Sequence, residues 1–325
     1  MTYERESACA ARAVREAAAL CQAVRRRLLG PGTLAKSDAS PVTVADFGSQ
    51  ALVCRALAEA FPGDPVIAEE DSAELRQPEH AAVLAEVLTA VGELRPGAVA
   101  AEVCGWIDHG GAGTYSDRFW TLDPIDGTKG FLRAEQYAVS LALVVEGRIA
   151  VAAMACPNLP ASRGGAPGAV FLAVRGQGAW ELPLEGDAVS GTPIRVSPLD
   201  DPTGARVCES VEAAHSAHGD AARVAERLGI AAPSVRLDSQ AKYAVVARGE
   251  AEIYLRLPTR ADYREKIWDH AGGVLILEEA GGRVTDVAGR PLEFTHGREL
   301  TANRGVIATN GRLHDRVLEA LGRTS

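Results

Sequence analysis

Apolar and polar positions along the 325-residue chain follow a helical spacing at first and a strand spacing later. Residues 5–29 predict an amphipathic helix, which ends at a Gly-Pro-Gly sequence. Residues 40–63 predict a short extended piece that leads into a second helix, and residues 65–71 predict a strand that runs into an acidic turn. A further helix is expected at about 78–93, followed by the glycine-rich connection GWIDHGGAGTYSDR at 105–118.

Beyond residue 118 the pattern changes to strands. After FWTLD, the apolar run YAVSLALVVEGRIAVAAMACP is interrupted at Glu146-Gly147, which predicts a hairpin. The stretch GAVFLAVRGQGAWEL predicts another hairpin, with its turn at Arg175-Gly176. Proline, aspartate and serine then accumulate between Pro193 and Pro202. We therefore expect two lobes, an α+β lobe at 1–195 and a lobe at 196–325.

The second lobe alternates helical and extended patterns. The expected elements are a helix at 220–229, the strand VRLD, the helix SQAKYAVVARG, the strand AEIYLRL, the helix DHAGGVLILEEAGG and the strand RVTD. Because strands that alternate with helices are typical of layered α/β structures, this lobe is predicted to be α/β.

Composition and charge narrow the functional classes. The chain is 47% hydrophobic, 24% charged and 5% aromatic, which is typical of a globular protein. Its net charge of −9 argues against a nucleic-acid polymer as partner, so a phosphorylated substrate would need local positive charge or metal ions. The six cysteines form no CxxC pair, which argues against a zinc site and a disulfide framework. With no signal-peptide core or transmembrane-length apolar run, we expect a cytoplasmic monomer or homodimer with no membrane partner.

Carboxylates recur where an expected strand stops and a turn or a helix starts, which would hold each of them at a strand edge. They are Asp46, Glu69, Glu70, Asp123, Asp126 and Asp269. A set of oxygen ligands without a convincing histidine or cysteine set suits Mg²⁺. In the sequence LDPIDGT the proline stiffens the turn and the glycine lets the chain fold back. Both aspartates and the carbonyl of Ile125 can then face one cation.

Each of these motifs also has a purely structural interpretation. Asp-Pro and Asp-Gly are common turn dipeptides, and the acidic run at 69–71 is typical of a solvated helix start. Asp269 can serve as the N-cap of the helix that follows it. The joint occurrence of the motifs favours the metal site.

The motifs VTVAD, the Glu-Glu pair, LDPIDGT and WDHAGG resemble, in order and spacing, those of the lithium-sensitive, metal-dependent phosphomonoesterase superfamily that includes inositol monophosphatase. The resemblance covers nearly the whole chain. The segments RFWTLDPIDGTKGFLR, LDSQAKYAVVARGEAEIYLRLP and YREKIWDHAGG are most similar to its 3′(2′),5′-bisphosphate nucleotidase branch. One departure is VEAAHSAH, which lacks the glycine that this branch often carries before the histidine, here His215.

The resemblance implies a layered α/β/α/β/α sandwich with the active site between the lobes, and two or three Mg²⁺ ions. One ion would be held by Glu69, Asp123 and the Ile125 carbonyl, and another by Asp123, Asp126 and Asp269. These metal roles are implied by the family and not by the spacing itself.

The catalytic and substrate roles that the resemblance implies fall on other residues. Thr128 would orient the attacking water and Asp46 would take its proton, with Glu69 as the alternative base and helix capping as the alternative role of Thr128. The expected substrate contacts are Thr128, His215, Ser239, Lys242, Arg256 and Asp269. An alternative for Arg256 is a strand-edge charge that pairs with a nearby glutamate.

The leading hypothesis is hydrolysis of the 3′-phosphate of adenosine 3′,5′-bisphosphate to AMP and phosphate, with the sulfated precursor of that nucleotide as a further candidate substrate. An alternative keeps the metal site and changes the substrate to an inositol phosphate or a sugar phosphate. Another alternative is a non-catalytic binder of the bisphosphate nucleotide. That binder predicts loss of a metal carboxylate or of the threonine, and the sequence retains them all.

Overall fold

The computed structural model of the protein describes residues 2–29, 40–162, 167–188, 191–211, 218–258, 260 and 262–322. Its strands form two sheets. The first has seven strands that follow one another in chain order. They are β1 (Val66–Ala68), β2 (Arg118–Asp126), β3 (Ala138–Val145), β4 (Arg148–Pro160), β5 (Pro167–Val174), β6 (Gly178–Pro183) and β7 (Thr192–Pro193).

Antiparallel hairpins account for most of the first sheet. β1 pairs with β2 in parallel, and each later neighbour pairs antiparallel. The hairpins predicted at Glu146-Gly147 and Arg175-Gly176 are confirmed, since they join β3 to β4 and β5 to β6.

The second sheet is mixed and has the strand order β11-β12-β10-β8-β9. Its strands are β8 (Val207–Glu209), β9 (Val235–Arg236), β10 (Ile253–Arg256), β11 (Arg283–Thr285) and β12 (Val306–Thr309). β8 runs parallel to both of its neighbours, whereas β12 runs antiparallel to β10 and β11. The predicted alternation of strands and helices is confirmed, but the sequence pattern did not predict β8 or β12.

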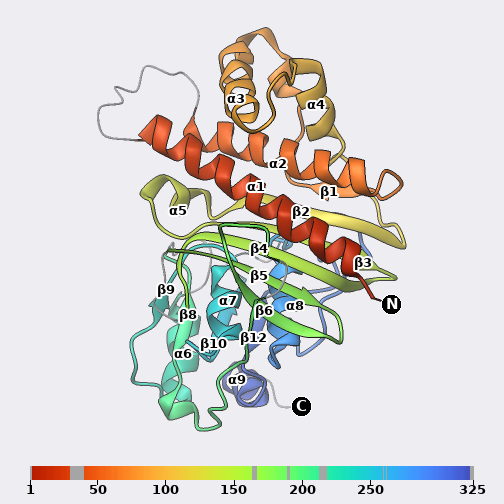
Figure 1. Ribbon diagram of the computed structural model, residues 1–325. Helices are drawn as coiled ribbons and strands as arrows, with labels where there is room; N and C mark the ends of the chain where they lie inside the picture. The colour runs from red at the N-terminus through yellow and green to blue at the C-terminus, as the bar shows by residue number, and fades with distance from the viewer. Residues whose placement is uncertain are drawn as a thin grey trace.

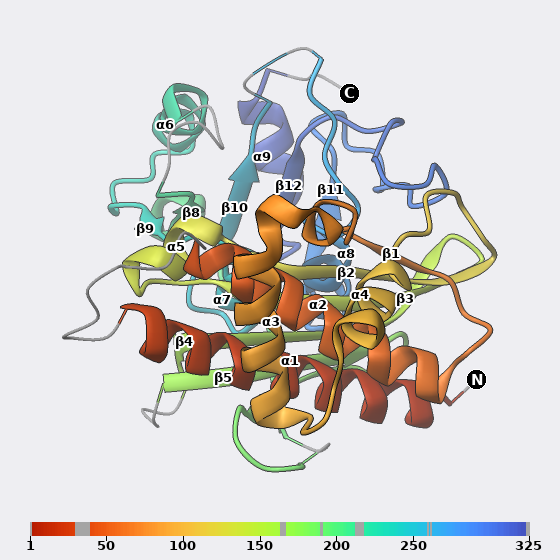
Figure 2. The same ribbon diagram turned by 90° about the horizontal axis from the view of Figure 1, so that it is seen from above.

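Helices cover the outer faces of both sheets and fill the space between them (Figure 1). They are α1 (Glu4–Leu29), α2 (Pro41–Ala60), α3 (Ala81–Leu94), α4 (Ala100–Asp108), α5 (Thr128–Arg133), α6 (His218–Arg227), α7 (Ala241–Ala247), α8 (Ala271–Glu279) and α9 (His314–Ala320). In Figure 2, α1 and α2 run side by side over the first sheet. α7 and α8 contact both sheets, and α6 and α9 pack on the second. The predicted α/β/α/β/α sandwich is confirmed.

Two local predictions in the first half are wrong. The extended piece expected at the start of 40–63 is helical, because α2 begins at Pro41. Proline suits the first turn of a helix, where its fixed φ is already helical and its missing N–H costs nothing. In the predicted glycine-rich connection, residues 105–108 form the last turn of α4.

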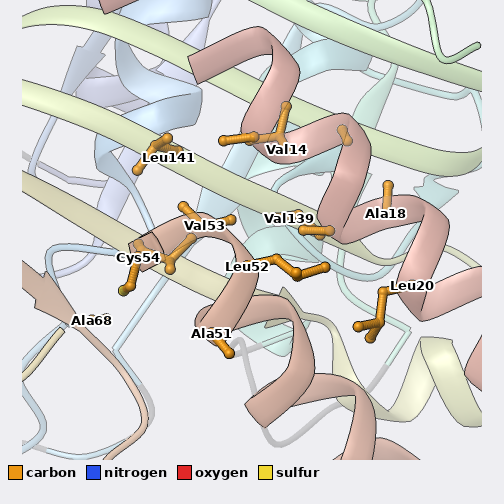
Figure 3. Close-up of a cluster of buried hydrophobic side chains, with 14 of the residues drawn as sticks. Val14, Ala18, Leu20, Ala51, Leu52, Val53, Cys54, Ala68, Val139 and Leu141 are labelled. Carbon is orange, nitrogen blue, oxygen red and sulfur yellow. The ribbon is translucent and has the colours of Figure 1, made fainter. Parts of the chain in front are cut away.

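The first sheet is buried on both faces. Along β3, Val139 and Leu141 point toward α1 and α2 (Figure 3), whereas Ala138 and Ala142 belong to the core shared with α7 and α8. Burial on both faces explains why the strands are continuously apolar instead of alternating with polar residues. This core holds in place the end of β2, which carries Asp123 and Asp126.

No helix in the described part of the chain is long and apolar enough to cross a membrane. The last strand of the first sheet ends at Pro193 and the first strand of the second begins at Val207. The division into lobes at 1–195 and 196–325 stays a prediction.

Leu52 lies in α2, fully buried against α1 and the first sheet (Figure 3). Leu52→Ala should lower the free energy of unfolding by about 2–5 kcal/mol, because the lost methyl groups leave a cavity that packed neighbours cannot fill. Urea unfolding followed by circular dichroism measures the change. Leu132→Ala, at a side chain that is 43% exposed, is the control and should change stability by less than about 0.5 kcal/mol. Equal effects of both substitutions would contradict this packing.

Candidate active site

A pocket with a cavity volume of about 390 Å³ lies where the two sheets and the central helices meet. It gathers residues from β2, the start of α5, the start of α7, β10 and the loop before α8. Its lining residues are Glu69, Asp123, Ile125, Asp126, Gly127, Thr128, Lys129, Ser210, Asp238, Ser239, Gln240, Lys242, Tyr254, Arg256, Tyr263 and Asp269. The structure therefore brings together every predicted site residue except Asp46 and His215. His215 lies outside the described residues.

The LDPIDGT motif forms the end of β2. Asp123 pairs with Ser140 of β3 and Asp126 pairs with Ala138, so the register shifts between the two aspartates. Such a bulge leaves extra residues without a partner and redirects the side chains around it. As a result, Asp123, Ile125 and Asp126 all line the pocket, although they belong to a bulged strand and not to the predicted turn.

Gly127 is required at the end of this motif. Its φ of 88° lies in the left-handed region, and a Cβ there would sit 2.9 Å from the Cβ of Ser239. Thr128 follows as the first residue of α5, with Gly127 at the N-cap position. Thr128 is thus not the helix cap that the alternative interpretation assumed, and it lines the pocket.

The carboxylates around the pocket perturb one another strongly. Burial raises the pKa of Asp123 well above its usual range, and the charges of Glu69, Asp126 and Asp269 add to the effect. Loss of hydration followed by the charges of Asp269, Glu70 and Asp126 raises the pKa of Glu69 to about 8. The pKa of Asp269 is also raised, mainly by burial, although Arg256 opposes the shift. The cluster holds more negative charge than its surroundings balance.

Asp46 lies in α2, behind the acidic cluster. It is buried, and its pKa is raised well above the usual range by burial and by the charges of Glu70 and Glu69. Its own charge acts in turn on Asp123. The prediction of Asp46 at a strand edge is wrong, because the surrounding residues are helical.

Two buried glutamines hold the chain beside the acidic residues. The side-chain amide of Gln50 pairs with both backbone groups of Glu70: its Nε2 donates to the carbonyl at 2.6 Å and its Oε1 accepts from the N–H at 3.0 Å. The backbone N–H of Gln240 donates to Asp126 Oδ2 at 2.6 Å. Ser239, directly before Gln240, has a φ of 68°, which is uncommon for a residue with a Cβ.

Lys242 is the buried cation of the pocket. Its side chain is 3% exposed, its Nζ donates to the Leu237 carbonyl at 3.1 Å and lies 5.3 Å from the ring centroid of Tyr254. Burial lowers its pKa to about 8. A lysine held in this way can present its charge to an anion in the pocket.

Arg256 pairs with two carboxylates and also lines the pocket. Its Nε donates to Glu265 Oε2 at 2.7 Å and its Nη2 donates to Asp269 Oδ2 at 3.0 Å. The alternative that Arg256 pairs with a nearby glutamate therefore describes the structure, and Arg256 also lines the pocket. Glu265, Asp269 and His270 lie close enough to bind a cation, and the Arg256 guanidinium already pairs with both carboxylates of that group.

The sequence reasoning missed part of the pocket lining. Ser210 lies in none of the quoted motifs, and Tyr254 and Tyr263 lie in the quoted YLRLP and YREK segments but were assigned no role. Asp238 and Gln240 flank Ser239 in the quoted DSQAK segment, so their position beside a predicted contact was the available signal. Asp238 is held by an ion pair with Arg133 of α5.

The chain belongs to the inositol monophosphatase family, whose model matches residues 3–324. Among curated proteins it is 46% identical over 349 residues to the 3′(2′),5′-bisphosphate nucleotidase of Emericella nidulans, covering 99% of this chain and 98% of that protein. It is 42% identical to the 3′(2′),5′-bisphosphate nucleotidase of Schizosaccharomyces pombe, covering 98% and 96%. The predicted resemblance to the bisphosphate nucleotidase branch is confirmed.

Solved structures of the same fold agree with the sandwich. The inositol monophosphatase of Zymomonas mobilis matches with a TM-score of 0.65 at 21% identity, covering 99% of this chain and 100% of that one. The inositol monophosphatase of Anabaena matches with a TM-score of 0.61 at 22% identity, covering 98% and 95%. At these identities the likeness concerns the fold alone.

The residues present fit a hard divalent cation. Asp123 Oδ1 is buried and has no hydrogen-bond partner among the described residues, and burial of such an atom is costly unless a ligand compensates it. The neighbouring donors are carboxylate oxygens and a backbone carbonyl, which Mg²⁺ prefers to nitrogen and sulfur.

The raised pKa values predict how the metal-free protein responds to pH. Because the pKa of Glu69 in the folded state, about 8, exceeds its ordinary value of 4.5, the folded state retains a proton that the unfolded chain has lost. The free energy of unfolding should therefore fall as pH rises from about 5 to 8. Lys242, with a lowered pKa of about 8, acts in the opposite sense only above that interval.

Urea unfolding in the presence of a chelator, at several pH values between 5 and 8, measures this dependence. Glu69→Gln should make the dependence shallower, because the glutamine cannot ionise. The same steepness in the variant and the parent protein would contradict the assignment.

Proposed function

We propose that the protein is a Mg²⁺-dependent phosphomonoesterase that hydrolyses the 3′-phosphate of adenosine 3′,5′-bisphosphate to AMP and phosphate. The observation that carries this proposal is one pocket that joins a cluster of carboxylates to a buried lysine. The carboxylates suit cations that bind the reacting phosphate, and the lysine suits a second anionic group on the same substrate. The names of the relatives support the same substrate.

The acidic residues would hold two or three Mg²⁺ ions. Glu69, Asp123 and the Ile125 carbonyl would form one site, and Asp123, Asp126 and Asp269 another. Mg²⁺, when bound, offsets the charge of the phosphoryl oxygens and lowers the pKa of water.

Thr128 and Asp46 would act on the attacking water. The Thr128 hydroxyl, at the start of α5, would orient the water, and Asp46 would receive its proton. Burial and the charges of Glu70 and Glu69 raise the pKa of the Asp46 carboxyl, which makes its carboxylate form a stronger base.

The substrate contacts would come from the second half of the chain. Lys242 and Arg256 would face the phosphate that is not cleaved, and Ser239 would contact the substrate from the strained turn before α7. His215 is proposed as a contact on the basis of the family resemblance alone. The sulfated precursor of the nucleotide carries the same 3′-phosphate and is proposed as a further substrate.

The remaining assignments follow from sequence composition. We propose a cytoplasmic monomer or homodimer whose partner is the small nucleotide substrate, without a nucleic-acid polymer or a membrane.

Phosphate release in Mg²⁺ tests the function directly. Adenosine 3′,5′-bisphosphate should be hydrolysed in strong preference to inositol 1-phosphate and fructose 1,6-bisphosphate at equal concentration. Preference for another ester would contradict the substrate assignment.

Asp126→Asn should abolish turnover while the circular dichroism spectrum stays unchanged, because the amide cannot supply the anionic oxygen. Near-normal turnover by the folded variant would mean that LDPIDGT has a structural role only.

Lys242→Met tests the recognition of the second phosphate. The variant keeps the length of the side chain and loses its charge, so KM for adenosine 3′,5′-bisphosphate should rise about 10- to 100-fold, the effect of one charged hydrogen bond. Adenosine 3′-monophosphate, which lacks the second phosphate, is the matched control, and its KM should change much less. Equal increases in KM for both substrates would contradict the assignment of Lys242 to the second phosphate.

A further inference from the structure

Gln240 joins three elements of the site through one side chain. It is 2% exposed and directly precedes α7. Its Nε2 donates to the Trp268 carbonyl at 2.9 Å. Its Oε1 accepts from Ser140 Oγ at 3.1 Å and from the backbone N–H of Gly273 at 3.1 Å. The amide therefore links β3, the loop before α8 and α8 itself.

Two of these side-chain bonds lead to residues beside a carboxylate. Ser140 lies opposite Asp123 in the β2–β3 register, and Trp268 directly precedes Asp269. Asp126 is bound directly, because the backbone N–H of Gln240 donates to its Oδ2 at 2.6 Å. A single residue thus contacts Asp126 directly and bonds to the chain beside Asp123 and Asp269.

Gly272, which has no side chain, leaves space for the Gln240 amide. A Cβ on Gly272 would lie 2.3 Å from Ser140 Oγ and 3.6 Å from Gln240 Oε1. A larger residue there would push α8 away from β3 and break the bridge. The first glycine of WDHAGG is therefore required by the close approach of α8 to Ser140 and Gln240.

The chemistry of the three partners also selects glutamine. The Trp268 carbonyl only accepts, and the Gly273 N–H only donates, so the bridging group must do both. A lysine or an arginine would add a positive charge that competes with a metal cation, and a glutamate would lose the donor. The neutral amide holds the acidic residues and leaves their charge available.

We propose that Gln240 is a positioning residue that fixes the separation of Asp123, Asp126 and Asp269 and thereby sets the affinity of the pocket for Mg²⁺. This inference rests on the metal-binding role in the proposed function. Groups that orient metal ligands commonly contribute about 10- to 100-fold to metal affinity.

The test compares two variants that each lose three side-chain hydrogen bonds. Gln240→Met removes the bridge with little change in volume. Asn310→Leu is the control: Asn310 is 2% exposed, donates to the carbonyls of Ser197 and Leu199, accepts from the N–H of Leu313 and does not line the pocket. Isothermal titration calorimetry with Mg²⁺ measures affinity in the absence of substrate, and thermal unfolding measures stability.

Gln240→Met should bind Mg²⁺ about 10- to 100-fold more weakly. Asn310→Leu should lose comparable thermal stability and keep the Mg²⁺ affinity of the parent protein. Parent-like affinity in Gln240→Met, or an equal loss in Asn310→Leu, would overturn the positioning role. If Gln240→Met does not fold, Ser140→Ala decides: weaker Mg²⁺ binding supports the bridge, and unchanged binding overturns it.

The same titrations separate this inference from the proposed function. If the parent protein binds no Mg²⁺, or if Asp126→Asn binds it equally well, the metal assignment itself fails and the positioning role fails with it. If the parent protein binds Mg²⁺ and Asp126→Asn does not, while Gln240→Met binds normally, only the positioning role fails.

Discussion

Repulsion between carboxylates is the constraint around which this molecule is built. Glu69, Asp123, Asp126 and Asp269 line one pocket, and burial, followed by the charges of neighbouring carboxylates, raises the pKa of Glu69, Asp123 and Asp269. Flexible side chains would move apart to reduce this repulsion. The fold prevents such relaxation because Asp123 and Asp126 lie in a strand of a sheet that is packed on both faces, and Asp269 pairs with Arg256.

The supports around the cluster are mainly neutral. Gln50 and Gln240 bond to backbone or carboxylate oxygens without adding charge, and the bulge in β2 aims two aspartates into the same space. Arg256 is the charged exception, and its pairing with Asp269 is shared with Glu265. Neutral supports preserve the field that attracts a divalent cation, whereas more arginines would have cancelled it.

How far the sequence predicts this structure depends on the range of the interactions involved. The hairpin at Glu146-Gly147 was predictable because turn residues interrupt a long apolar run. Asp46 was misplaced because the run Val-Thr-Val before it favours a strand, and the helix became clear only from its packing against α1. Gln240 had only its position beside Ser239 as a signal, since its partners Ser140 and Asp126 lie 100 and 114 residues away.

The bond between Gln240 and Asp126 also has a consequence for synthesis of the protein. A chain that has emerged from the ribosome only through β7 contains Glu69, Asp123 and Asp126 but lacks α7 and α8. At that stage the inner face of the first sheet is uncovered and recognisable to chaperones. Arrival of α7 and α8 buries that face and completes the pocket in one late event. Cellular surveillance of exposed apolar surface would therefore also remove molecules whose active centre is unfinished.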